Sequence, residues 1–122
     1  MDKAAALKRG RSAERRAAIL LRLKGYAVLA RNFRPAKSAG LGEIDIVARR
    51  GRTLAFIEVK ARAAEADAIF AIAPEQQARI ARAADHFLKT RPRYRHFNQR
   101  FDAMVLEAGR FWPRHLTDAF RP

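Results

Sequence analysis

The chain is 122 residues long and 49% apolar, which suits one domain with one hydrophobic core. It contains no cysteine, so disulfides and thiolate zinc sites are excluded. No stretch approaches the roughly 18 apolar residues that a membrane-spanning helix requires. The basic N-terminus has no apolar segment of the secretory type, and we expect a cytoplasmic protein with no membrane partner.

Positive charge dominates the composition. Lys and Arg number 26, of which 20 are Arg, against 12 Asp and Glu, for a formal net charge of +14. Because the guanidinium group binds phosphate through a planar fork of donors, nucleic acid is the expected partner, DNA first. A solubility charge or the codon bias of a GC-rich genome explains the same composition, and charge alone specifies no site.

The N-terminal third predicts one helix and one strand. Residues 1–11 are short and charged, and we expect them to be flexible. Ser12 fits an N-cap, and apolar residues at helical spacing predict a helix over 12–24, with Gly25 at its C-cap. A strand is expected at 26–33, followed by a loop at 35–40.

Two neighbouring strands are predicted at 43–48 and 54–61, and residues 63–73 are ambiguous. Pro74 fits the first position of a second helix, which Pro92 ends. Its apolar stripe consists of Ile80, Ala83, Ala84, Phe87 and Leu88. Further strands are expected at 101–107 and 111–116. This order predicts a single α/β domain over residues 1–122, with a mixed central sheet flanked by helices.

Charged side chains interrupt the two apolar strands at 43–48 and 54–61. Because side chains alternate along a strand, Glu43 and Asp45 share one face of the first, and Glu58 and Lys60 share one face of the second. Whether these faces coincide depends on the turn. A two-residue turn at 50–51 pairs Asp45 with Phe56 and leaves Glu58 as a diagonal neighbour within reach of one cation. An odd-length loop would turn Asp45 to the opposite face.

Both faces of this predicted hairpin are otherwise apolar, which indicates that the sheet is covered on both sides. Buried carboxylates are costly unless they are paired or bound to metal, and a divalent cation, Mg²⁺ or Mn²⁺, removes that cost. The alternative is an exposed Glu58–Lys60 salt bridge at a strand end, which is the commoner explanation for either fragment alone. The joint pattern in two strands favours the metal site.

These residues carry a family resemblance. Asp45 followed by Glu58, Val59 and Lys60 resembles the PD-(D/E)XK nuclease superfamily. The whole chain is similar to the YraN-type bacterial family, described as similar to archaeal Holliday junction resolvases. The matching stretches are 14–17, 25–26, 31–34, 42–48, 56–62, 100–102 and 119–120. The resemblance implies a restriction-endonuclease-like core. One departure is Gln76, near a position where the family commonly has lysine.

The resemblance also implies roles for individual residues. Glu14 would be the carboxylate of the first helix. Asp45 and Glu58 would bind the metal together with the backbone carbonyl of Val59. Lys60 would position the attacking water and stabilise charge in the transition state. By the same resemblance, a neighbouring acidic residue, Glu43, supports these ligands or a second metal ion.

The predicted function is hydrolysis of DNA phosphodiester bonds, with branched or junction DNA as a candidate substrate, by an Mg²⁺- or Mn²⁺-dependent endonuclease. The arginines expected to bind phosphate are Arg31, Arg34, Arg49, Arg50, Arg52 and Arg62. The alternative is a non-catalytic nucleic-acid-binding module of the same fold, acting in recombination, repair or DNA uptake. A four-way junction has two symmetric scissile strands, so that substrate would require a homodimer.

Three further residues lie outside this predicted site. Asp102 lies in a predicted strand and is expected to pair with a neighbouring arginine. Phe111 and Trp112 are expected to pack in the core, with stacking on a nucleic-acid base as the alternative.

Overall fold

The structure is a computed structural model that describes residues 3–35, 42–62 and 72–122. Residues 36–40 of the expected loop at 35–40 lie outside the described residues. The same holds for residues 63–71 of the ambiguous segment at 63–73. The elements in chain order are α1 (Lys3–Leu23), β1 (Ala27–Phe33), β2 (Ile44–Arg50), β3 (Thr53–Arg62), α2 (Pro74–Thr90), the 3-10 helix η1 (Pro92–Tyr94), β4 (Asn98–Glu107) and β5 (Arg114–Leu116). No helix in these segments is long and apolar enough to cross a membrane.

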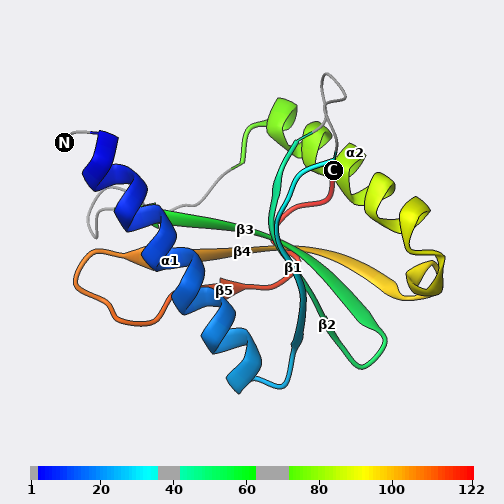
Figure 1. Cartoon of the computed structure of the whole chain (residues 1–122), viewed down its shortest axis with the longest axis horizontal. Coiled ribbons are helices and arrows are strands. Elements are labelled where there is room, and N and C mark those ends of the chain that lie inside the picture. Colours follow the sequence, from blue (N-terminus) through cyan, green and yellow to red (C-terminus); the bar gives the residue numbers. More distant parts are fainter. Residues whose placement is uncertain (1–2, 36–41, 63–71) are drawn as a thin grey trace.

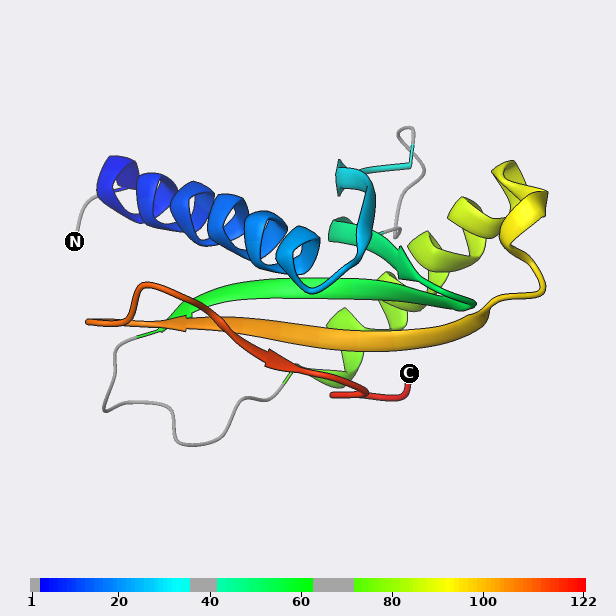
Figure 2. The same cartoon turned by 90° about the horizontal axis from the view of Figure 1, so that it is seen from below.

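The five strands form one mixed sheet in the order β1-β2-β3-β4-β5. Strands β3 and β4 pair in parallel over their whole length, and the other neighbours are antiparallel. Parallel neighbours need a crossover connection, and α2 belongs to the one between β3 and β4. Helix α1 runs along the other face of these two strands (Figures 1 and 2). The predicted mixed sheet flanked by helices is confirmed.

Each helix buries one apolar stripe against one face of the sheet. The α2 stripe is buried as predicted, against a cluster that includes Val47, Leu54 and Phe56. On the other face, α1 buries Ala13, Ala17, Ala18 and Leu21 against Ile46, Ala55, Ile57 and Val59. Successive residues over 46–48 of β2 and 54–57 of β3 therefore enter opposite core clusters. The small alanines of α1 let this helix approach the sheet closely.

Helix α1 begins well before the predicted start. The prediction of a flexible segment over 1–11 is wrong for residues 3–11, which are helical, and Ser12 lies within the helix. The physical reason is that this stretch is rich in Ala, Lys, Leu and Arg, the strongest helix formers. The predicted end is confirmed by a Schellman motif, in which the Gly25 N–H donates to the Arg22 carbonyl (3.0 Å) and the Tyr26 N–H donates to the Leu21 carbonyl (2.9 Å).

The hairpin turn between β2 and β3 lies one residue later than predicted. Arg50 pairs with Thr53, so the two turn residues are Gly51 and Arg52. Gly51 has φ +60°, which suits the first central position of a type II′ turn, where glycine is favoured. The shift pairs Val47 with Phe56, and the predicted register is wrong by two residues. Two residues are a full strand period, so the predicted face is kept.

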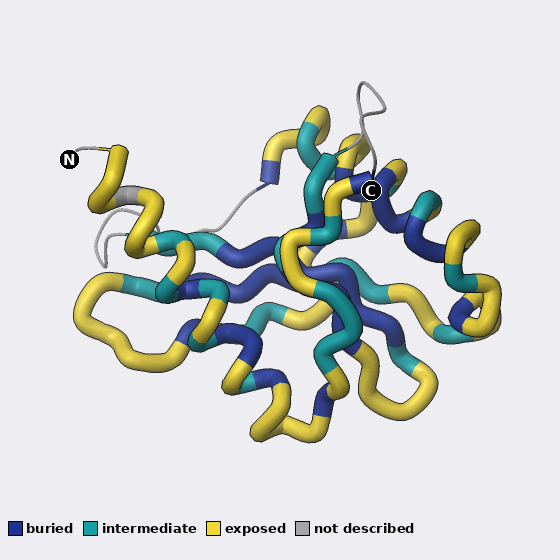
Figure 3. Tube along the Cα trace, in the orientation of Figure 1, coloured by how far each residue is buried: buried dark blue, intermediate teal, exposed yellow. Residues whose placement is uncertain are grey.

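The last strand is shorter than predicted, because pairing of β5 with β4 begins only at Arg114. The preceding Pro113 has no N–H to donate to a strand ladder. Phe111 and Trp112 consequently lie in the loop between β4 and β5, where 60% and 41% of their surface is exposed. The expectation that they pack in the core is wrong, and this loop is among the exposed parts of the chain in Figure 3.

Candidate active site

The two carboxylates of the hairpin lie close together at the start of β2, where the side chains of Asp45 and Glu58 form a hydrogen bond. The ladder between β2 and β3 ends at the pair Ile46–Ile57, directly beside these two residues. There the Val59 N–H donates to the Asp45 carboxylate (2.8 Å). Glu58 is only 6% exposed, although it is charged. The structure therefore brings these two predicted site residues closer together than the diagonal arrangement expected from the sequence.

This pairing changes the acidity of Asp45. Burial, a hydrogen bond with Glu58 and the charge of Glu58 raise the pKa of Asp45 to about 8, although the Val59 N–H acts in the opposite direction. At neutral pH the Asp45 carboxyl therefore holds a proton. A divalent cation that bound here would have to displace this proton.

Two further side chains contact Glu58. The Lys60 Nζ lies 3.8 Å from the Glu58 Oε2, and the Lys60 side chain is 30% exposed, so its ammonium group reaches both the carboxylate and solvent. The side-chain amide of Gln76, in the first turn of α2, donates to the same oxygen. Gln76, which departs from the family pattern, thus lies at the candidate site itself. The sequence indicated the departure but not this position.

Helix α1 and strand β1 bring a third carboxyl to this region. Burial raises the pKa of Glu14, and the charge of Asp45 adds to the effect, while a hydrogen bond from Asn32 lowers it. Asn32 has φ +52°, a left-handed conformation that asparagine tolerates better than most residues. Asn32 was not among the predicted site residues, and its only sequence signal was its place in the matching stretch 31–34.

A close backbone contact positions the start of β2. The Gly42 N–H donates to the Arg79 carbonyl of α2 (3.2 Å), and a side chain at Gly42 would meet the Arg79 backbone at 3.0 Å. Glycine is therefore required where the chain enters the strand that carries Asp45. The next residue, Glu43, forms an exposed salt bridge with Arg34 at 3.1 Å.

A hollow of about 710 Å³ lies between α1 and the end of β1. Its lining combines two carboxylates with basic residues. The lining residues are Lys3, Leu7, Gly10, Arg11, Glu14, Asn32, Arg34 and Glu43. Because Glu14 interacts electrostatically with Asp45, the hollow adjoins the paired carboxylates. Its basic residues could bind an anionic chain and hold it beside the two carboxylates of the lining.

The donor set fits one Mg²⁺ or Mn²⁺ ion. Two hard carboxylate oxygens converge at Asp45 and Glu58, and Mg²⁺ is usually held by one or two carboxylates while it keeps several waters. Within the described residues, no group of three or more His, Cys, Asp or Glu side chains could hold a metal ion. Glu14 is thus not a third direct ligand in this arrangement. The Val59 carbonyl as a ligand stays a prediction.

The predicted phosphate-binding arginines fall into separate groups. Arg31 lowers the pKa of Glu14 through its charge, and Arg34 pairs with Glu43, so these two lie at the carboxylates. Arg49, Arg50 and Arg52 lie at the tip of the β2–β3 hairpin. They were expected beside the site, but at about 3.3 Å per residue the tip is roughly 15 Å from Asp45. Arg62 ends β3 at the opposite end of that strand.

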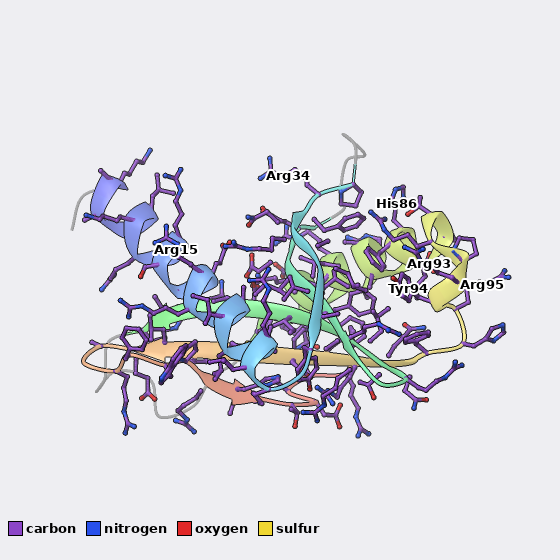
Figure 4. The ribbon with its side chains drawn as sticks, turned by 60° about the horizontal axis from the view of Figure 1, so that its bottom comes forward. Arg15, Arg34, His86, Arg93, Tyr94 and Arg95 are labelled. Carbon is purple, nitrogen blue, oxygen red and sulfur yellow. The ribbon has the colours of Figure 1, made fainter. Side chains whose placement is uncertain are left out.

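The hairpin-tip arginines stack on aromatic rings. Arg52 and Arg49 lie over Phe97, with their guanidinium carbons 5.0 and 5.7 Å from the ring centroid. Arg50 lies 4.7 Å from the centroid of Tyr26. Two more arginines flank Tyr94 in the sequence, and Figure 4 shows Arg93 and Arg95 at the far side of the molecule from Arg15 of α1. Phosphate binding by the hairpin-tip arginines stays a prediction.

Asp102 is fully buried and belongs to a separate network. Both oxygens accept from Arg100 (2.8 Å each), and they also interact with the His115 ring (2.8 Å) and the Asp118 N–H (2.9 Å). Burial alone would raise the pKa of Asp102, but these hydrogen bonds outweigh it and lower the pKa. Arg100 also donates to the Tyr26 hydroxyl (2.6 Å). The expected pairing with a neighbouring arginine is confirmed.

Comparison with known proteins adds the family. The model of the uncharacterised protein family UPF0102 matches residues 13–106. A UPF0102 protein of Paramagnetospirillum magneticum is 50% identical over 96% of this chain and 90% of its own length. UPF0102 proteins of Nitrobacter winogradskyi (53% identity, 95% and 94% coverage) and Parvibaculum lavamentivorans (51%, 97% and 85%) are similarly close. The matched stretch contains Glu14, Asp45, Glu58 and Lys60. These names state no activity.

Proposed function

Because the chain belongs to the UPF0102 family, which is the YraN family that its sequence resembles, we propose that it is a metal-dependent endonuclease of the PD-(D/E)XK type. Its substrate would be DNA, and its cofactor Mg²⁺ or Mn²⁺. Branched DNA is the first candidate substrate.

One observation carries this proposal: on neighbouring strands, the half-buried Asp45 carboxyl forms a hydrogen bond with the buried Glu58 carboxyl, and the pKa of Asp45 is raised to about 8. A structural role alone would be served better by apolar residues, because buried carboxyls destabilise the fold. Lys60 on the same strand as Glu58 adds the cation that the nuclease pattern requires.

The residues divide the chemistry between them. Asp45 and Glu58 would hold the divalent ion, which supplies Lewis-acid polarisation of the phosphoryl group and of a water molecule. The Val59 N–H fixes the Asp45 carboxylate in place. Lys60 supplies positive charge where negative charge develops on the phosphoryl oxygens, and its partial exposure lets it reach the substrate. Glu14 is not a direct ligand and lines the neighbouring hollow.

A second candidate function is supported by the contacts of Glu58. Gln76 and Lys60 already satisfy this carboxylate without a metal ion. In a protein that uses this surface only to bind nucleic acid, these contacts would take the place of the metal ion. Such a protein would bind its ligand without cleaving it. This alternative is the non-catalytic binding module.

Cleavage assays separate the two functions. Labelled four-way junctions, flaps and linear duplexes are incubated with the protein and Mg²⁺ or Mn²⁺, with EDTA as the control. The endonuclease predicts metal-dependent products that Asp45→Ala and Glu58→Ala abolish. Cleavage that survives either substitution would exclude the proposed site, and binding without cleavage under every metal would favour the binding module.

A further inference from the structure

The exposed aromatic pair Phe111 and Trp112 is unexplained by the carboxylate site. The two rings meet edge to face, with centroids 4.8 Å apart and planes at 86°. Neither residue enters a core cluster formed by the part of the chain that the structure describes. The Arg16 guanidinium of α1 covers the Phe111 ring at 4.7 Å. Phe111 therefore contacts the Arg16 guanidinium on one side and the Trp112 ring on another. Trp112 keeps 41% of its surface exposed.

Positive charge surrounds this pair. A hollow of about 200 Å³ adjoins it between α1 and the ends of β3 and β4, and its lining includes Arg9, Arg16, Arg62 and Arg110. Among the described residues, Glu107 is the one acidic residue in the lining, and it is paired with Arg114 at 3.5 Å. An exposed aromatic side chain beside several arginines is the arrangement with which proteins bind single-stranded nucleic acid, since the ring stacks on a base and the arginines bind the backbone phosphates.

We propose that Phe111, Trp112 and Arg16 form a stacking platform for an unpaired nucleobase, with the phosphates of that strand on the neighbouring arginines. The proposal rests on the proposed function only in taking nucleic acid as the ligand. The charge of the surface argues against an apolar peptide as its occupant, and the exposed area of two side chains is small for a stable protein interface.

The position of the platform specifies the substrate further. Arg62 follows Glu58 on β3 by four residues, or about 13 Å, so the platform lies at the end of the strand that carries the candidate site. Helix α1 separates the two hollows: Glu14 and Arg11 line the carboxylate side, and Arg9 and Arg16 line the platform side. Figure 1 shows the loop between β4 and β5 at the same end of the molecule as the N-terminal turns of α1. A nucleic acid that bound both sites would place one of its strands at the carboxylates and an unpaired base on the other side of α1. Branched or flapped nucleic acid has this arrangement.

The test uses the fact that Trp112 is the only tryptophan in the chain. Its fluorescence is followed during titration with a twelve-nucleotide oligothymidylate and with a blunt duplex, in EDTA so that no cleavage occurs. We expect quenching by the single strand that weakens with salt, and little change with the duplex. Anisotropy of labelled oligonucleotides gives the two affinities independently.

Variants decide between stacking and a merely structural role. Trp112→Ala should weaken single-strand binding about fivefold to a hundredfold, while duplex binding stays unchanged and shows that the fold is intact. Trp112→Phe should retain most of the affinity. Leu23→Ala removes an apolar side chain that is 71% exposed at the other end of α1 and should change nothing.

Three results would overturn the platform. The first is single-strand binding without quenching, and the second is an equal loss of affinity for both ligands in Trp112→Ala. The third is fluorescence that depends on protein concentration alone, which would indicate a second copy of the chain on this surface. Quenching in a protein that cleaves nothing would support the platform within the binding-module function. Cleavage without quenching would overturn the platform and leave the nuclease site standing.

Discussion

Asp45→Asn replaces a carboxyl that holds a proton with an amide of the same shape that cannot titrate. The amide oxygen can still accept from the Val59 N–H, and the amide nitrogen can donate to Glu58 as the protonated carboxyl does. The substitution therefore removes the cost of ionising Asp45 and leaves the packing unchanged. In the absence of metal, the variant should be more stable than the wild type at alkaline pH.

The magnitude follows from the raised pKa. The folded chain binds the Asp45 proton up to about pH 8, whereas the unfolded chain loses it near 3.8. Between these values the folded state binds more protons, so the free energy of unfolding falls as pH rises. At about 1.4 kcal/mol for each pH unit the ceiling is about 6 kcal/mol. Because Asp45 is only half-buried and solvent screens its charge, we expect about 2–3 kcal/mol.

Urea denaturation at about pH 5.5 and about pH 8.5, in EDTA, measures this difference. We expect Asp45→Asn to be more stable than the wild type at both pH values, by a margin that is larger at the higher pH, because the wild type loses stability from about pH 3.8 to about pH 8. Asp85→Asn is the matched control, because Asp85 is exposed in a surface pair with Lys89 that contributes about 0.5 kcal/mol or less. If Asp45→Asn keeps the pH slope of the wild type, Asp45 does not hold a proton at neutral pH and the electrostatic description of the site is wrong.

Three other measurements test the surrounding structure. Asp102→Ala should lower the free energy of unfolding by about 3–5 kcal/mol in urea, because it leaves the Arg100 guanidinium unpaired, and a loss below about 1 kcal/mol would contradict the role of that network. Asn32→Ala should cost about 1–2 kcal/mol for a left-handed alanine and reduce cleavage further by releasing Glu14, whereas Asn32→Gly should restore the stability without the activity. Duplex affinity should fall with salt at a log-log slope near −5 if ~6 phosphates are neutralised, and a slope near zero would exclude the arginines as phosphate ligands.

Local chemistry explains which parts of the fold were predictable. The α2 stripe from Ile80 to Leu88 and the helix start at Pro74 follow from side-chain periodicity and from the fixed φ of proline, and both are as predicted. The shared face of Asp45 and Glu58 was also predictable, because any even turn gives it. The exact register was not, since it depended on whether Gly51 takes the second or the first central position of the turn.

Other features depended on contacts between distant segments. Gln76 reaches Glu58 only because α2 packs across the sheet, and the left-handed Asn32 faces Glu14 only because α1 crosses β1. Periodicity along the chain contains no information on either contact. Phe111 and Trp112 have the composition of core residues, and only the late start of β5 after Pro113 leaves them exposed.

Titration of the protein with Mn²⁺ by calorimetry tests the candidate site most directly. Near pH 7, in buffers of different ionisation enthalpy, we predict one Mn²⁺ ion bound with release of a proton from Asp45. Asp45→Asn and Glu58→Gln should abolish this binding, and Asp85→Asn should not. The account would be contradicted by a wild-type protein that binds no Mn²⁺, or by binding that is unchanged in both site variants.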